Sequence, residues 1–193
     1  MTLMHKVQKL CKLLNAVGGQ KMSNKIGIIL GSDSDLPEMK KCCDVLDKYE
    51  ISYEILVSSA HRLPHNTAQW AQSAAERGID VIIAAAGMAA HLPGVVAAHT
   101  HLPVIGVPLK SKVLDGVDAL YSIVQMPPGV PVATVAIGGS RNAAYLAMQI
   151  LGIKYPEISE KVKQHKLDTA TNAMAKNEKL QRIGVKAYVE GMK

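Results

Sequence analysis

Ser59, His61 and Arg62 lie within a span of four residues and carry the most distinctive chemistry of the chain. The guanidinium of an arginine presents a planar fork that suits bidentate contact with a phosphate, and an imidazole gives and takes a proton near neutral pH. Taken singly, Arg62 fits a surface ion pair and His61 fits a loop hydrogen bond. Together they indicate a candidate site for phosphate binding and acid–base catalysis.

A second candidate segment, residues 31–35 (Gly-Ser-Asp-Ser-Asp), combines hydroxyls and carboxylates just before a predicted helix. The free N–H groups at a helix N-terminus attract an anion, Ser32 and Ser34 add hydroxyl donors, and Asp35 could accept both hydroxyl groups of a ribose. Asp35 could instead cap the helix, with Glu38 completing a capping box. On this loop alone, the capping interpretation is favoured.

A third segment, residues 86–94, surrounds His91 with alanines and glycines. Such small residues would let a planar heterocycle lie against the backbone. Taken alone, His91 is better explained as a partly buried structural histidine. His99 and His101 fall at a predicted helix end and a turn, and both are given structural roles.

Two other kinds of active site are disfavoured. No set of histidines and carboxylates has the spacing of metal ligands, so no metal is expected. A serine hydrolase could use Ser59 and His61, but the pattern G-x-S-x-G is absent and no acid is placed to orient the histidine.

The elements that must position these segments follow a repeating pattern. Five apolar runs rich in Val and Ile alternate with segments of helical character, and the runs begin 23 to 29 residues apart, which is the spacing of right-handed β-α-β units. The sequence therefore predicts an α/β fold: a doubly wound parallel sheet, flavodoxin- or Rossmann-like, in a three-layer sandwich. The predicted strands are 25–30, 52–57, 80–85, 103–107 and 132–137, and the predicted helices are 36–50, 65–77, 94–100, 115–125 and 142–151. In such a sheet, ligands bind outside the carboxyl ends of the strands, so the three candidate segments should meet there.

The chain divides into three parts. Residues 1–21 are expected to be an N-terminal extension that is not part of the fold, because Met22 reads like an ordinary start just before the first strand. Residues 22–155 form the predicted α/β catalytic domain. Residues 156–193 form a predicted helical tail that starts at Pro156 and packs on a neighbouring subunit, because so polar a helix buries little against its own sheet.

Charge and composition exclude other functions. The net charge is +6, but residues 1–21 and 154–193 each contribute +4 and residues 22–153 contribute −2; with 4% aromatic residues and no Phe, a nucleic-acid-binding face is not expected. Residues 81–109 carry no charge, yet their glycines and prolines exclude a membrane span. Three cysteines and no secretory leader favour the reducing cytosol and hence a cytoplasmic location.

Together, the candidate loops resemble those of the bacterial N5-carboxyaminoimidazole ribonucleotide mutases, class I of the purine-biosynthesis PurE family. The resemblance covers residues 25–151, with its motifs in the expected order and spacing. It rests on 31–35, 59–64 (Ser-Ala-His-Arg-Leu-Pro), 86–94 (Ala-Gly-Met-Ala-Ala-His-Leu-Pro-Gly), 106–108 (Gly-Val-Pro), 125–132 (Gln-Met-Pro-Pro-Gly-Val-Pro-Val) and 142–147 (Asn-Ala-Ala-Tyr-Leu-Ala).

The resemblance implies that a carboxyl group moves from N5 to ring carbon C4 of a ribonucleotide, through decarboxylation, trapped carbon dioxide and recarboxylation. It implies His61 as the catalytic proton carrier, Ser32 and Arg62 at the substrate phosphate, and Asp35 at the ribose. It places Ser59, Gly87, His91 and Leu92 in the pocket for the base and carboxylate. It also implies a homo-octamer that uses no metal, nucleoside triphosphate or organic cofactor.

Three alternatives stay open. A direct aminoimidazole ribonucleotide carboxylase would use free carbon dioxide, although residues 89–94 look like the mutase type. A flavodoxin-like module could bind FMN or a nucleotide without catalysis, although the loops lack flavin-stacking aromatics. An adaptor protein would use its apolar surface. One departure from the family pattern is Met88, which stands where a glycine is common, so the third loop could have a different backbone.

Overall fold

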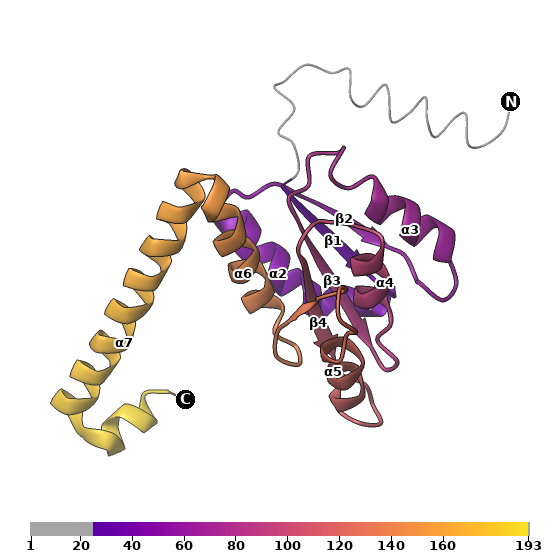
Figure 1. Ribbon diagram of the computed structural model, residues 1–193. Coiled ribbons are helices and arrows are strands. Elements are labelled where there is room, and N and C mark those ends of the chain that lie inside the picture. The colour runs from indigo at the N-terminus through magenta and orange to yellow at the C-terminus, as the bar shows by residue number, and fades with distance from the viewer. Residues whose placement is uncertain (1–24, 193) are drawn as a thin grey trace, which may run out of the picture.

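The computed structural model describes residues 25–192. Its centre is a parallel sheet of five strands in the order β2-β1-β3-β4-β5 (Figure 1). The strands are β1 (Ile26–Leu30), β2 (Tyr53–Val57), β3 (Val81–Gly87), β4 (Val104–Leu109) and β5 (Ala133–Thr134). This order is that of flavodoxin-like doubly wound sheets, so the predicted fold class is confirmed. The extension predicted at 1–21 lies outside the described residues.

The register of the sheet brings the strand ends level. Leu30 of β1 pairs with Val57 of β2 on one side and with Ala85 of β3 on the other, and Gly87 of β3 pairs with Leu109 of β4. All pairs are parallel, so the loops that follow these strands leave from one edge. The chain turns from β1 outward to β2 and then returns to β3, which makes the gap between the β1 and β3 loops the switch point of the sheet.

The central strands are apolar on both faces, as strands covered by two layers of helices must be. Every residue of β1 and β4 is buried, and only Gly87 of β3 is not. One face packs on α2 (Leu36–Lys48) and α6 (Ser140–Lys154) through Ile28, Ile83 and Val107. The other face packs on α3 (Pro64–Gln72), α4 (Leu92–Ala98) and α5 (Val117–Val124) through Ile29 and Ile82. The result is the predicted three-layer sandwich (Figure 1).

The fifth strand is much shorter than predicted, because β5 has two residues where the sequence favours 132–137. Val135 N–H still donates to Gly106 O at 3.1 Å, and Gly138 N–H donates to Pro108 O at 2.9 Å. Pro108 faces β5 at the next step of the ladder and has no N–H to donate, so the regular pairing stops there.

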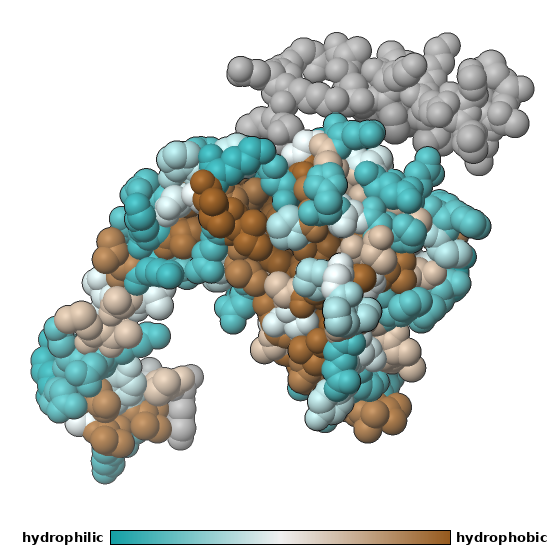
Figure 2. Space-filling model, viewed as in Figure 1, coloured by the Kyte–Doolittle hydropathy of each residue, from teal (hydrophilic) through white to brown (hydrophobic). Residues whose placement is uncertain are grey.

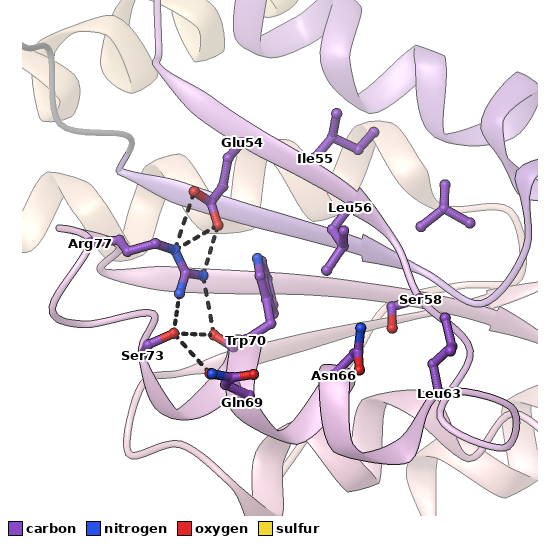
Figure 3. Close-up of a pocket in the computed structure, with 11 residues that line it drawn as sticks. Glu54, Ile55, Leu56, Ser58, Leu63, Asn66, Gln69, Trp70, Ser73 and Arg77 are labelled. Carbon is purple, nitrogen blue, oxygen red and sulfur yellow. Dashed lines mark hydrogen bonds and ion pairs between the residues drawn. The ribbon is translucent and has the colours of Figure 1, made fainter. Parts of the chain in front are cut away.

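The edge strand β2 is tied to the end of α3, which stops at Gln72 rather than at the predicted residue 77. Figure 3 shows Arg77 reaching Glu54 of β2, with Nη2 2.8 Å from Oε1, and also donating to Trp70 O and to Ser73 Oγ. Trp70 packs over β1 at Gly27, where an added Cβ would lie 2.8 Å from the indole. These contacts of Arg77 and Trp70 hold α3 against the sheet, and with it the loop between β2 and α3.

The predicted helical tail is α7 (Pro156–Glu190), which follows α6 directly and projects away from the sheet (Figure 1). Only Ile158 is buried, and Tyr49 Oη lies 3.0 Å from Nδ1 of His165. Gly184 has non-helical φ and ψ angles and interrupts the helix. Figure 2 shows apolar side chains gathered at the free end of the tail. No helix within residues 25–192 combines the length and apolarity needed to cross a membrane.

Candidate active site

A cavity of about 720 Å³ lies at the carboxyl edge of the sheet, between the loops that follow β1, β2, β3 and β4. All eight residues that the sequence singles out line it, although they come from three loops up to 60 positions apart: Ser32, Asp35, Ser59, His61, Arg62, Gly87, His91 and Leu92. The sheet therefore brings together every predicted site residue. The cavity spans the switch point, where doubly wound sheets bind ligands.

His61 and His91 form a pair among the residues that line the cavity. Nδ1 of His91 lies 3.2 Å from Nε2 of His61, and the rings stack with centroids 5.1 Å apart and planes 26° apart. His61 comes from the turn after β2, and His91 directly precedes α4. Both residues are exposed, and both line the cavity. A hydrogen bond between two imidazoles needs one donor and one acceptor, so each ring constrains the tautomer of the other.

The β1 loop does not use Asp35 as the predicted cap. A 3₁₀ turn over Asp33–Asp35 runs straight into α2, so the backbone of Asp35 is already helical (φ −86°, ψ −16°) and its side chain caps nothing. Ser32 takes the capping role, because its Oγ accepts a hydrogen bond from Ser34 N at 3.3 Å. Glu38 makes no capping box either: it accepts from Ser140 Oγ at 2.7 Å and pairs with Lys41. The Asp35 carboxylate is thus left at the cavity wall.

The electrostatics of Asp35 reflect that position. Burial raises the pKa of Asp35 above the ordinary aspartate value, and the nearby charge of Asp33 adds to the shift. Hydrogen bonds with the Ser32 backbone and the Ser34 hydroxyl act in the opposite direction but do not cancel it. A half-buried carboxylate with few local partners is suited to accept hydrogen bonds from ligand hydroxyls.

Arg62 extends from the turn after β2 toward the β1 loop, where Nη2 lies 3.5 Å from Gly31 O. Within the described part of the chain its guanidinium pairs with no carboxylate. Ser59 shapes this turn, because its carbonyl accepts from Leu63 N at 2.7 Å and its Oγ accepts from Arg62 N at 3.4 Å. Among the described residues, Ser59 Oγ makes no hydrogen bond to the His61 ring, so the geometry gives no support to a hydrolase dyad.

The β3 loop is held in an unusual shape by Met88, whose φ of +56° is in the left-handed region. Gly87 ends β3, and two short hydrogen bonds follow, from Ala90 N to Met88 O at 2.8 Å and from His91 N to Ala89 O at 2.6 Å. A methionine here adopts the backbone that a glycine takes without steric cost. Met88 thus holds a backbone conformation that favours glycine. Leu92, 3% exposed, anchors the loop in the core.

Four cavity residues of the β4 loop, at 110–113, are not predicted from the sequence. β4 runs to Leu109, beyond its predicted end at residue 107, so the loop that reaches the cavity begins at Lys110. Lys110, Ser111, Lys112 and Val113 all line the cavity. Two lysines that follow a long uncharged stretch at a strand end are the signal that would have identified them. Within residues 25–192, no three His, Cys, Asp or Glu side chains are grouped as metal ligands.

Comparisons with known proteins identify the family of the chain. Residues 25–172 match the family model described as AIR carboxylase. The N5-carboxyaminoimidazole ribonucleotide mutase of Thermotoga maritima is 57% identical over 165 residues, which is 86% of this chain and 96% of that protein. The phosphoribosylaminoimidazole carboxylase of Saccharomyces cerevisiae is 54% identical over 86% of this chain, which covers 29% of that longer protein.

A solved structure extends the likeness to the fold. The crystal structure of Treponema denticola PurE superposes with a TM-score of 0.73 at 29% identity, covering 80% of this chain and 97% of that one. The family match spans the sheet, the cavity loops and the first part of α7. The chain therefore belongs to the AIR carboxylase family.

Proposed function

We propose that the protein is an N5-carboxyaminoimidazole ribonucleotide mutase, an isomerase that forms 4-carboxyaminoimidazole ribonucleotide in de novo purine (IMP) synthesis. The observation that carries the proposal is the similarity to the Thermotoga maritima protein of that name. The match covers 96% of the length of that protein. The His61–His91 pair at the cavity supplies the acid–base groups that such a reaction needs.

His61 is the proposed proton carrier. When the bond between N5 and the carboxyl carbon breaks, carbon dioxide is released and N5 takes a proton from the His61 imidazolium. When C4 attacks the carbon dioxide, a carbon–carbon bond forms and the proton on C4 passes to the His61 imidazole. In each turnover His61 gives one proton to N5 and receives one from C4, so the cycle is balanced with a single acid–base group and no added cofactor.

The substrate would lie across the switch point. Arg62, with no ion-pair partner among residues 25–192, and the hydroxyl of Ser32 would hold the phosphate. Asp35 would accept the ribose hydroxyls. Ser59, Gly87, His91 and Leu92 would surround the base and the carboxyl group. His91 would also hold the His61 ring in one orientation, through the 3.2 Å contact.

Carbon dioxide must be retained between the two steps, which requires a narrow pocket that excludes bulk water. The β3 side of the cavity is lined by Ala86, Gly87 and Ala89, which leave room for a small linear molecule and offer it no competing proton donor. These residues are the proposed holding site.

The proposal includes a cytoplasmic homo-octamer in which the tail packs on a neighbouring subunit. Beyond its first turns, α7 exposes large apolar side chains, among them Leu167 (62%), Met174 (65%) and Val185 (70%). Apolar side chains in this number on a projecting helix are typical of a surface that another chain covers. Sedimentation equilibrium of the full chain distinguishes an octamer from a monomer.

A direct aminoimidazole ribonucleotide carboxylase is the second candidate, favoured by the name of the Saccharomyces cerevisiae relative. A non-catalytic flavin-binding module is less well supported, because none of the residues that line the described cavity is Phe, Tyr or Trp. A turnover assay without metal or ATP separates the candidates. We expect conversion of N5-carboxyaminoimidazole ribonucleotide; conversion of only aminoimidazole ribonucleotide with bicarbonate would favour the carboxylase, and conversion of neither would reject both.

A further inference from the structure

Two lysines of the β4 loop, Lys110 and Lys112, line the same cavity as Arg62. In the strand order β2-β1-β3-β4-β5, Arg62 follows β2, and the lysines follow β4, three strand positions away. Neighbouring strands lie about 4.8 Å apart, so the strand ends from which these two cationic groups extend are roughly 14 Å apart at the sheet edge. A nucleotide spanning the switch point would therefore present a different end to each of them.

Neither lysine is neutralised by the protein. Within residues 25–192, Lys110 and Lys112 have no ion pair, although Lys110 also borders a smaller adjoining cavity lined by Asp35, Glu38 and Lys41. Glu38 is already engaged, with its Oε2 2.6 Å from Nζ of Lys41. Two unpaired ammonium groups at the wall of a cavity favour an anionic ligand.

The backbone that carries the lysines is fixed. Ser111, between them, donates to the Asp118 carboxylate of α5 at 3.4 Å and accepts from Leu114 N at 3.3 Å. The start of the loop is set by β4, whose last residue, Leu109, pairs with Gly87 of β3. The loop is thus held from both ends next to the proposed base pocket.

We propose that Lys110 and Lys112 recognise the carboxyl group of the nucleotide and so select carboxylated over uncarboxylated aminoimidazole ribonucleotides. This inference rests on the proposed function, which assigns the phosphate to Arg62 and assigns no lysine or arginine to the second anionic group of the substrate. Apart from Arg62, Lys110 and Lys112 are the only lysine or arginine side chains that line the described cavity. An ammonium–carboxylate contact is a charge-assisted hydrogen bond, stronger than a neutral one.

The test is calorimetric binding of 4-carboxyaminoimidazole ribonucleotide and of aminoimidazole ribonucleotide, which differ by the carboxyl group. We expect Lys110→Gln with Lys112→Gln to weaken binding of the carboxylated nucleotide by on the order of tenfold or more and to leave the other nearly unchanged. The control Lys40→Gln removes the same charge from the exposed face of α2, where Lys40 pairs with Asp44, and should change neither affinity.

The other outcomes overturn the inference in distinguishable ways. An equal loss for both nucleotides would mean that the lysines attract any anion and do not read the carboxyl group. Unchanged binding of the carboxylated nucleotide would mean that they do not contact it. Wild-type protein that binds neither nucleotide would overturn the proposed function along with the inference. Raising the salt concentration should reduce the preference of the wild type for the carboxylated nucleotide, because added ions screen the contact.

Discussion

Nδ1 of His91 lies 3.2 Å from Nε2 of His61, and this contact joins two loops that are 30 residues apart in the sequence. The rings also stack, so each imidazole packs against the other. A proton carrier must present the correct ring nitrogen to its substrate. The hydrogen bond made by the other nitrogen of the same imidazole determines which nitrogen that is. The pair therefore separates two roles that can be tested by mutation.

His61→Asn should lower kcat by roughly 10²–10⁴-fold, the range that acid–base catalysis contributes, while nucleotide affinity changes little. His91→Asn should lower kcat by about 10–100-fold, because it disturbs the orientation of His61 without removing the proton carrier. Steady-state kinetics with calorimetric binding measures both. Near-normal turnover of the His61 variant would exclude His61 as the proton carrier. Equal losses of kcat in the two variants would contradict the assignment of proton transfer to His61 and of positioning to His91.

Arg62→Ala should weaken nucleotide binding by on the order of tenfold or more, because it removes a charged hydrogen-bond donor from the proposed phosphate site. Arg62→Lys should be intermediate, since it keeps the charge and loses the planar fork. The readout is the Kd for aminoimidazole ribonucleotide. Comparison with the corresponding nucleoside, which lacks the phosphate, is the control, and its affinity should be the same for all three proteins. An unchanged nucleotide Kd for the alanine variant would return Arg62 to a structural role.

Asp35 should make stability fall as the pH rises. Burial raises its pKa in the folded state, so the folded protein binds this proton more tightly than the unfolded chain. Stability from this group is greatest below the ordinary aspartate pKa and is lost as the pH rises through the raised value. Asp35→Asn should therefore be more stable than wild type at pH 7 and lose that advantage toward about pH 4.

Thermal unfolding of the two proteins across this pH range measures the effect. The same substitution should weaken binding of the ribonucleotide, because an amide oxygen accepts hydrogen bonds less strongly than a carboxylate. A stability advantage that persists unchanged at acid pH would show that the ionised carboxylate is not its source.

Met88 gives a test of the β3 loop. Its side chain is 63% exposed, so little packing is lost on substitution, while its φ of +56° strains any residue that has a Cβ. Met88→Gly should change the free energy of unfolding by less than about 1 kcal/mol, because relief of strain offsets the added entropy of the unfolded chain. Met88→Val should destabilise by about 1–2 kcal/mol, since a β-branched side chain tolerates this backbone poorly. Equal unfolding midpoints for the two variants in urea would contradict the strained backbone.

The fold and the gathering of the site residues follow from the sequence, because both depend on patterns that persist along the chain. Apolar runs such as 25–30 and 80–85 can be covered on both faces only in a parallel sheet. Parallel strands then place Ser32, His61 and His91 at one edge, whatever the details of the loops.

What could not be predicted depends on single backbone groups. Pro108 fits the sheet as part of β4 yet ends the β5 ladder, because its missing N–H faces that side. Asp35 has the sequence context of a cap, but the 3₁₀ turn before it gives that task to Ser32. β4 continues two residues past its predicted end, which brings Lys110 and Lys112 to the cavity. Hydrophobic periodicity carries no information on any of these points.

The central claim is that the carboxyl group stays within the cavity while it moves from N5 to C4. The most direct measurement is a single turnover of N5-carboxyaminoimidazole ribonucleotide labelled with ¹³C in the carbamate, in a solution of unlabelled bicarbonate. Mass spectrometry of the 4-carboxyaminoimidazole ribonucleotide formed should find the label retained. A product whose carboxyl group carries the unlabelled carbon of the solution would contradict the account and favour a carboxylase that draws on free carbon dioxide.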